Sequence, residues 1–204
     1  MNIYVVRHGE TKWNAEGRLQ GWLNSELTDK GKAQAARLRE VLQIPFQQVY
    51  SSPSKRAADT AKIITNGEQP ILFDERLKEI HLGSWQGRLI ADIEKEDGKR
   101  YECYVQMPET YIPDTGESIQ TVKKRMNDFL QDCLKNEAEN ILVVTHGVSI
   151  RALLLAVYNW PIDKIWSFDE IDGTSVTKIV ATSTEPTVQY IGKMPHSTHS
   201  MENY

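Results

Sequence analysis

Short apolar runs rich in β-branched residues recur along the chain and predict the strands of a sheet. The clearest are residues 3–6 and 141–144, which read Ile-Tyr-Val-Val and Ile-Leu-Val-Val. Because these two runs are apolar at every position, we expect both strands to be buried. The other predicted strands are residues 48–51, 71–73, 175–180 and 187–191.

Segments of helical character separate these strands. Thr28 has the position of an N-cap, Asp29 follows it, and Pro45 ends the helix that they begin. A second helix begins at Pro53 or Ser54 and runs to residue 64, since proline suits the first turn of a helix. The other predicted helices cover residues 89–106, with Gly98 as an unfavourable interior residue, 118–136 and 147–158.

The alternation of strands and helices predicts an α/β fold, a three-layer α/β/α sandwich with a mostly parallel central sheet. At 204 residues we expect residues 1–204 to form a single domain. Residues 84–116 hold a heavily charged predicted helix and a proline-containing loop, and we interpret them as a small helical insertion that serves as a lid. The apolar segment 150–160 suits either the core or a dimer face, and we favour the core.

Composition narrows the choice of partners and compartment. The net charge is −4, which argues against nucleic acid as a partner, because such surfaces usually need a basic face. No apolar run is long enough to span a membrane, and the N-terminus lacks the features of a signal peptide. We interpret Cys103 and Cys133 as free thiols in a reducing compartment, so we expect a cytoplasmic monomer or homodimer.

Two of the predicted strands end in a histidine followed by glycine, at His8-Gly9 and at His146-Gly147. The carboxyl ends of parallel strands meet at the edge of a sheet where ligands bind, so we expect both histidines there. A lone histidine at a strand end is more often structural than catalytic. Two such sites, one of them next to Arg7, point instead to a catalytic centre.

Arginines and a carboxyl group complete a candidate phosphate site. Arg7 directly precedes His8, and Arg56 lies in the first turn of a predicted helix, where the helix N-terminus favours anions. On composition alone, Arg56 is as easily a solvated surface residue. Glu79 precedes a loop rich in glycine and tryptophan, where a partly desolvated carboxyl group would suit a proton donor. Spacing alone does not select Glu79 over Glu75.

Taken together, these motifs resemble the signature of the histidine phosphatase (phosphoglycerate mutase-like) superfamily. The matching runs, in chain order, are residues 7–11, 13–14, 18–22, 27–31, 50–53, 56–57, 60–61, 77–80, 83–87, 116–118, 145–147 and 173–177. They span most of the chain, and several are specific, so chance does not explain them. Within the superfamily, residues 173–177 and His196 look most like the bacterial broad-specificity phosphatases.

The resemblance implies a role for each matching residue. His8 would be the nucleophile that becomes phosphohistidine, and Glu79 would be the acid for the leaving group and then the base for water. The other implied site residues are Arg7, Arg56 and His146, which would bind the phosphoryl oxygens, and Asn14, Gln20, Gly21 and Gly147, which would bind substrate. We expect the arginines to lower the pKa of His8 and keep its imidazole nucleophilic. No metal and no cofactor are expected, because arginines and His146 supply the positive charge.

The expected activity is metal-independent hydrolysis of small phosphomonoesters, with broad specificity. The alternatives are a cofactor-dependent phosphoglycerate mutase, an α-ribazole phosphatase and a phospho-ligand binding protein without turnover. A mutase would have a longer middle insertion, a tyrosine where Leu82 stands and an asparagine where Val148 stands.

Substrate specificity is expected to come from residues 84–116, the part least like the superfamily. Four aromatic residues there could form an apolar wall beside the phosphate site or could pack the insertion onto the core: Trp85, Tyr101, Tyr104 and Tyr111. An apolar wall would discriminate weakly between leaving groups. His196 and His199 could bind a metal, but we expect solvated side chains instead.

Overall fold

The computed structural model of the chain describes residues 1–181 and 185–194. The hypotheses about His196 and His199 therefore lie outside the described residues. No helix in the described ranges has the length and apolar character needed to cross a membrane.

A six-stranded sheet forms the centre of the described part of the chain, in the order β3-β2-β4-β1-β5-β6. The strands are β1 (Asn2–Arg7), β2 (Gln48–Ser51), β3 (Leu72–Phe73), β4 (Asn140–Thr145), β5 (Val176–Ala181) and β6 (Pro186–Lys193). The four strands from β3 to β1 are parallel, whereas β5 and β6 are antiparallel to their neighbours. The predicted, mostly parallel sheet is thus confirmed, with an antiparallel extension on the β1 side.

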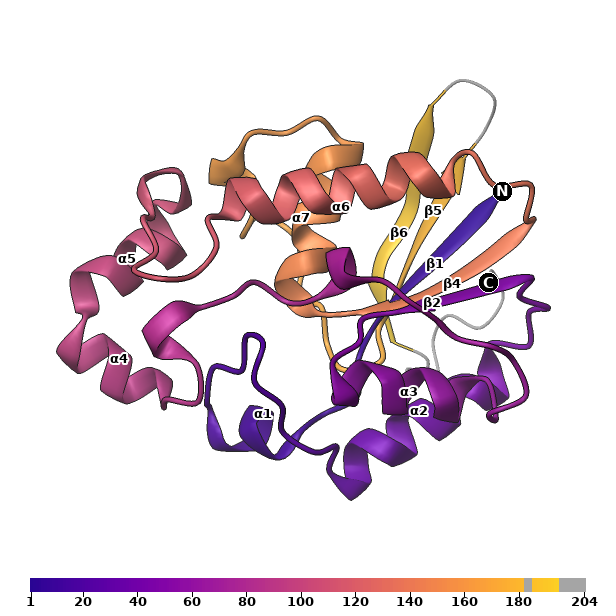
Figure 1. Cartoon of the computed structure of the whole chain (residues 1–204), viewed down its shortest axis with the longest axis horizontal. Helices are drawn as coiled ribbons and strands as arrows, with labels where there is room; N and C mark the ends of the chain where they lie inside the picture. The colour runs from indigo at the N-terminus through magenta and orange to yellow at the C-terminus, as the bar shows by residue number, and fades with distance from the viewer. Residues whose placement is uncertain (182–184, 195–204) are drawn as a thin grey trace.

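Helices cover both faces of the sheet (Figure 1), as predicted for a three-layer sandwich. The helices are α1 (Lys12–Glu16), α2 (Asp29–Val41), α3 (Lys55–Ile64), α4 (Ile90–Glu96), α5 (Gly98–Gln106), α6 (Ile119–Cys133) and α7 (Gly147–Val157). Single 3-10 turns lie at Glu75–Leu77, Gly83–Trp85, Pro108–Thr110 and Ile162–Lys164. In Figure 1, α2 and α3 lie below the sheet and α6 lies above it.

Alternation along β1 divides the core between the two faces. Ile3 and Val5 belong to the buried cluster that includes α6 and α7, whereas Tyr4 and Val6 belong to the cluster that includes α2 and α3. Successive side chains of a strand point to opposite faces, so a run that is apolar throughout is buried on both sides. The segment from Ile150 to Leu155 packs into the first cluster, which confirms the core prediction for this part of residues 150–160, whereas Tyr158 and Trp160 are exposed.

The predicted helix over residues 89–106 is wrong as a single element, because α4 and α5 are separated at Asp97. Asp97 has φ −138°, and its carboxylate accepts a hydrogen bond from Trp85 Nε1 at 2.9 Å. Gly98 then begins the second helix, consistent with its poor fit to a helix interior. The insertion is helical as predicted, but it bends around the indole of Trp85.

The short helix α1 was not predicted. Thr11 and Asn14 form a capping box at its start, since the Thr11 hydroxyl accepts from the Asn14 backbone and the Asn14 side chain accepts from the Thr11 backbone. Gly17, at φ 71°, ends the helix in the left-handed conformation. With only five residues, α1 is too short for a helical pattern of apolar positions to be recognised in the sequence.

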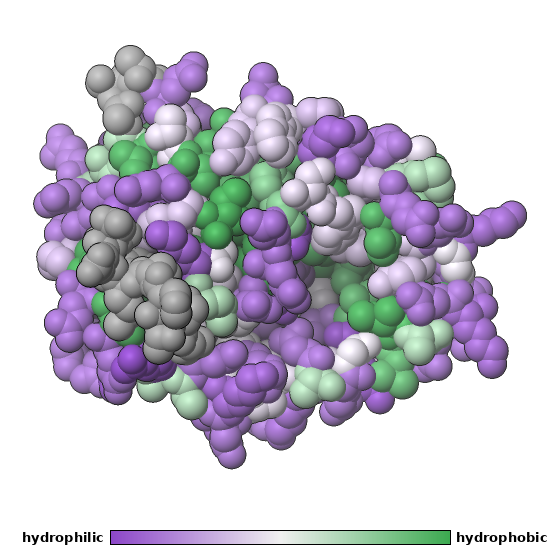
Figure 2. All heavy atoms as spheres, turned by 180° about the vertical axis from the view of Figure 1, so that it is seen from behind, coloured by the Kyte–Doolittle hydropathy of each residue, from purple (hydrophilic) through white to green (hydrophobic). Residues whose placement is uncertain are grey.

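The surface opposite the view of Figure 1 is mostly hydrophilic (Figure 2). Its apolar side chains lie in separate groups between polar ones and do not form one continuous patch. Scattered apolar residues of this kind are ordinary on a protein surface.

Candidate active site

The two strand-end histidines lie side by side, as predicted. β1 and β4 are neighbours with Arg7 opposite Thr145, so His8 and His146 leave the sheet at the same edge. Their ring centroids are 5.1 Å apart, at an interplanar angle of 63°. Both side chains are buried, with His8 3% exposed and His146 fully enclosed.

The hydrogen bonds of His8 select one tautomer. Nδ1 lies 2.8 Å from the carbonyl oxygen of Gly9, so the proton is on Nδ1. The lone pair on Nε2 accepts a hydrogen bond of 3.3 Å from Arg56 Nε. Burial, and then the charges of Arg56 and Arg7, hold the pKa of His8 well below its usual value. The imidazole is therefore neutral at physiological pH, as predicted, although burial lowers its pKa more than either arginine does.

Arg56 lies in the first turn of α3 and is only 1% exposed, so it is not a solvated surface residue. Its guanidinium donates to the backbone oxygens of Leu23, at 2.7 Å, and Gly21, at 2.8 Å. Burial lowers the pKa of Arg56 to about 10, so its side chain stays cationic. Arg56 therefore joins the loop after α1 to His8.

Arg7 occupies the last position of β1, and its Nη1 donates to the oxygen of Ile171 at 2.7 Å. Burial lowers the pKa of Arg7, against the opposing charges of Glu79, Asp172 and Glu170. The backbone oxygen of Arg7 accepts a hydrogen bond from Thr174, which has a φ of 62°. A β-branched residue in this region is strained. The strained turn is therefore hydrogen-bonded to the backbone at the end of β1.

The Glu79 carboxylate lies at the N-terminus of α7. It accepts hydrogen bonds from the backbone nitrogens of Val148 and Ser149, both at 3.2 Å, and from that of Ile80 at 2.9 Å. The structure thus places Glu79 at the site rather than Glu75. Glu75 lies in a 3-10 turn and pairs with Lys78 instead.

His146 lies behind His8 and contacts Ser52, with 2.8 Å between its Nε2 and the hydroxyl oxygen. Burial, then the charges of Arg56 and other cations, holds the pKa of His146 well below its usual value. Its Nδ1 is buried without a partner among the described residues, as are Arg7 Nε and Gln20 Oε1. Buried polar atoms are normally hydrogen-bonded, so these three atoms retain capacity for a ligand.

One cavity of about 270 Å³ joins these groups. It is lined by eight of the nine predicted site residues: Arg7, His8, Asn14, Gln20, Gly21, Arg56, Glu79 and Gly147. His146 is the ninth and contacts the cavity only through its neighbours. Four arginines and two glutamates line the cavity, so it is positive although the chain is acidic.

Several residues of the outer wall were not predicted from the sequence. Arg18 and Arg151 are two further cations of the lining, and Trp166, Glu170 and Ile171 come from the segment after α7. Arg151 lies four positions after Gly147 on the same helix, a spacing that places both on one face. That spacing is a signal that could have identified Arg151. No sequence pattern singles out Trp166.

The hypothesis of an aromatic wall is wrong for three of its four residues. Tyr104 lines the cavity, but Trp85, Tyr101 and Tyr111 do not. Instead their rings contact one another, with the Trp85 centroid 5.7 Å from that of Tyr111 and 5.8 Å from that of Tyr101. These aromatic residues pack the insertion onto the core, which was the alternative interpretation. Trp85 is fully buried.

In the part of the chain that the structure describes, no group of three or more histidine, cysteine, aspartate or glutamate side chains is arranged to hold a metal ion. Cys103 and Cys133 are both free thiols, as predicted. The positive charge of the cavity comes from its arginines.

The model of the histidine phosphatase superfamily (branch 1) matches residues 3–193. This chain belongs to that superfamily. Among superfamily members, phosphoserine phosphatase 1 of Hydrogenobacter thermophilus is 32% identical over 171 residues, covering 82% of this chain and 81% of that protein. Phosphoglycerate mutase-like protein 4 of Arabidopsis thaliana is 42% identical over 157 residues, covering 74% of this chain and 68% of that protein.

The solved structures of the superfamily confirm the fold. YhfR of Bacillus stearothermophilus superposes with a TM-score of 0.90 and 39% sequence identity, over 94% of this chain and 96% of that one. Superfamily membership and the phosphatase relatives together support a phosphatase that acts on small phosphate esters.

Proposed function

We propose that this chain is a metal-independent phosphatase that hydrolyses small phosphomonoesters through a phosphohistidine at His8. The observation that carries the proposal is the state of the His8 imidazole. Its proton is directed to Gly9, its Nε2 lone pair accepts from Arg56, and Arg7 is a second cation beside it. Attack on phosphorus would exchange the hydrogen bond from Arg56 for the N–P bond. A neutral nucleophile among fixed cations suits attack on a dianionic phosphoryl group.

In the first step, His8 Nε2 forms a bond to phosphorus while the ester P–O bond breaks. The leaving oxygen takes a proton from the Glu79 carboxyl group, which lines the same cavity. Arg7 and Arg56 donate to the equatorial oxygens, where negative charge must be stabilised. His146, whose ring centroid lies 5.1 Å from that of His8, would be a further donor through Nδ1, which has no partner among the described residues.

In the second step, Glu79 takes a proton from water as the water oxygen attacks phosphorus. The N–P bond breaks, and its electron pair returns to His8 Nε2. Inorganic phosphate leaves, and the Glu79 carboxyl group is again ready to act as an acid. Two easier steps replace one difficult displacement.

We propose broad specificity for compact leaving groups. The outer wall mixes apolar side chains, such as Leu82 and Trp166, with the charged Arg18, Arg151 and Glu170. No single leaving group matches this mixture, while the volume of about 270 Å³ limits its size. Asn14, Gln20, Gly21 and Gly147 would bind substrate on the nucleophile side.

A phosphoglycerate mutase is the second candidate, because a relative named mutase-like is 42% identical to this chain. The same phosphohistidine would then return its phosphoryl group to a second substrate oxygen instead of to water. Val148 argues against this, since it stands where the mutases resembled by the sequence have asparagine.

The test is to incubate the purified protein with 3-phosphoglycerate, a trace of 2,3-bisphosphoglycerate and EDTA, and to follow the products by phosphorus NMR. Free phosphate is the expected product. Formation of 2-phosphoglycerate with little free phosphate would instead identify a mutase. If neither product forms, an aromatic phosphate ester tested against His8→Ala distinguishes a wrong substrate from a binding protein.

A further inference from the structure

The backbone that carries Glu79 is held in place by side chains rather than by regular structure. Between the 3-10 turn Glu75–Leu77 and Ile80, the carbonyl of Leu77 accepts from the Thr145 hydroxyl at 2.6 Å, and that of Lys78 accepts from the Ser149 hydroxyl at 2.7 Å. The position of Glu79 therefore depends on which side chains reach this segment.

Arg125 of α6 makes the largest contribution. Its Nη1 donates to the carbonyls of Arg76, at 2.5 Å, and Lys78, at 2.6 Å, and its Nη2 donates to the carbonyl of Glu79 at 3.0 Å. Nε and Nη2 also donate to the two carboxylate oxygens of Glu117, both at 3.0 Å. All five N–H groups of a guanidinium thus have an acceptor.

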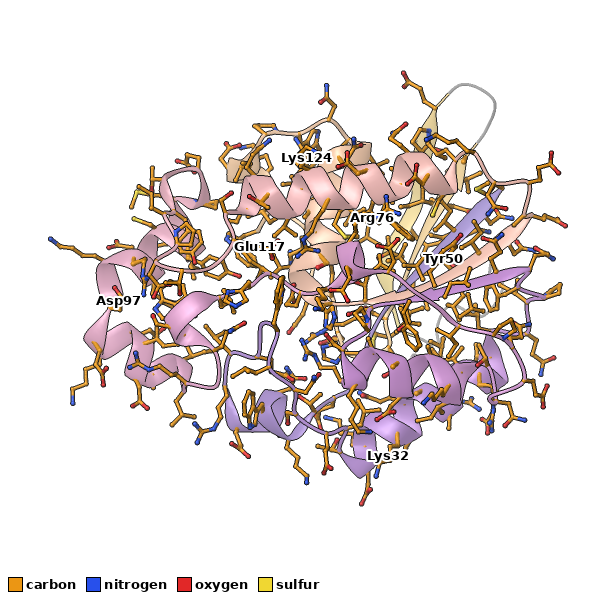
Figure 3. All side chains as sticks on the ribbon, in the orientation of Figure 1. Lys32, Tyr50, Arg76, Asp97, Glu117 and Lys124 are labelled. Atoms are coloured by element: carbon orange, nitrogen blue, oxygen red, sulfur yellow. The ribbon has the colours of Figure 1, made fainter. Side chains whose placement is uncertain are left out.

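Glu117 binds the backbone on the other side of Glu79, at His81. Its Oε2 accepts from the backbone nitrogen of His81 at 2.9 Å, and its own nitrogen donates to the His81 carbonyl at 2.8 Å. The side chains of Arg125 and Glu117 are only 14% and 15% exposed. In Figure 3, Glu117 lies below the start of α6, between this helix and the segment that carries Glu79.

We propose that Arg125 is a positioning residue for Glu79, holding its backbone from the α6 side while α7 holds its carboxylate. This inference rests on the proposed role of Glu79 as the general acid and base. Arg125 does not line the cavity, so it acts only through the segment that it binds. Without it, the Arg76 carbonyl loses its side-chain donor, and the carbonyls of Lys78 and Glu79 keep only the Ser149 hydroxyl and Trp22 Nε1. The segment can then shift.

Such a shift affects proton transfer selectively. General acid–base catalysis needs the acid within hydrogen-bond reach of the leaving oxygen, and a displacement of about 1 Å can cost on the order of 10²-fold in rate. The loss falls on esters whose leaving group needs a proton. An ester with an acidic leaving group, such as nitrophenyl phosphate, needs little help from the acid.

The experiment compares release of the alcohol in a single turnover from glycerol 3-phosphate and from 4-nitrophenyl phosphate. For Arg125→Met, we expect release of glycerol to slow about 10²-fold and release of nitrophenol to stay within about threefold. Glu79→Gln is measured in parallel and should show the same pattern with a larger loss. Lys124→Met is the matched control, because Lys124 is an exposed cation of the same helix that pairs with Asp128. It should behave as the parent does.

Arg125→Lys keeps the positive charge but lacks the five N–H donors of the guanidinium. It is the second variant to measure if Arg125→Met does not fold. We expect it to slow release of glycerol about tenfold and to spare release of nitrophenol. An equal loss with both esters, in either folded variant, overturns the positioning role. If Glu79→Gln shows the leaving-group dependence and the Arg125 variants do not, only the inference about Arg125 fails. If Glu79→Gln shows none, the proposed function fails as well.

Discussion

The imidazoles of His8 and His146 are neutral because each is enclosed in protein beside cations. Burial is the larger cause of both lowered pKa values, and Arg56 is the next. Neutrality leaves Nε2 of His8 nucleophilic, but it has a cost for folding. In the unfolded chain the same side chains bind protons freely below their ordinary pKa.

This cost predicts a pH dependence of stability. An unfolded histidine titrates near pH 6.5, whereas folded His146 stays neutral well below that value, so the unfolded state binds more protons as the pH falls. Each buried histidine then lowers the free energy of unfolding by up to about 1.4 kcal/mol per pH unit below about 6.5. Between pH 7 and pH 5.5, the free energy of unfolding should fall by about 1 kcal/mol less in His146→Gln than in the parent protein. Urea unfolding at the two pH values measures this difference. Equal losses in the two proteins would show that His146 takes up a proton in the folded state.

At the scale of elements, the start of α2 packs closely against the turn that follows His8. A Cβ at Gly31 would lie 2.1 Å from the carbonyl oxygen of Glu10, and one at Gly9 would lie 2.5 Å from the carbonyl oxygen of Gly31. Both contacts are with backbone, which cannot move aside as a side chain can. The two glycines thus allow α2 to pack directly against the turn that follows His8.

The contact predicts opposite effects for two helical glycines. Gly31→Ala should lower the free energy of unfolding by about 1–3 kcal/mol, although alanine is the better helix former. Gly98 begins α5 and has no atoms near its Cβ position, so Gly98→Ala should be neutral or stabilising by up to about 1 kcal/mol. The urea unfolding midpoints of the two variants and the parent protein measure both effects. Similar midpoints for the two variants would mean that α2 does not press on the loop.

The elements that the sequence predicted well are those whose local pattern agrees with their tertiary surroundings. Thr28 and Ser118 cap α2 and α6 as expected, because their hydroxyls accept from the backbone nitrogens of Gly31 and Thr121. The break at Asp97 was missed because it depends on the indole of Trp85, twelve residues away. Local helix propensity cannot predict a hydrogen bond between residues so far apart in the sequence.

The same distinction applies to the candidate site. The predicted site residues occur in short runs such as Arg7-His8-Gly9, so the sequence displays them directly. Trp166 and Ile171 reach the cavity only because of how the segment after α7 returns to the sheet edge. Arg125 is hidden for a further reason, since on an amphipathic helix a partly buried arginine looks like a surface charge.

At the scale of the whole molecule, we predicted a single domain, which requires residues 84–116 to unfold together with the sheet. Trp85 joins the insertion to the main core cluster, where it is buried with Tyr104 and Ile119. We expect one cooperative transition in urea, with tryptophan fluorescence and far-UV circular dichroism giving the same midpoint. Separate midpoints for the two probes would indicate that the insertion is an independent unit.

The arrangement of charge over the molecule also bears on function. The chain carries a net charge of −4, yet its cavity collects four arginines around one neutral histidine. This contrast favours the binding of small anionic substrates at the cavity. The central claim that follows is that His8 itself carries the phosphoryl group during turnover.

The most direct test is to trap that intermediate. The protein is mixed with 4-nitrophenyl phosphate, quenched within one turnover in alkaline denaturant to preserve phosphohistidine, and digested for mass spectrometry. We expect one added phosphoryl group on the peptide that contains His8, lost on treatment with acid and not formed in His8→Ala. A phosphoryl group on another residue, or turnover retained by His8→Ala, would contradict it.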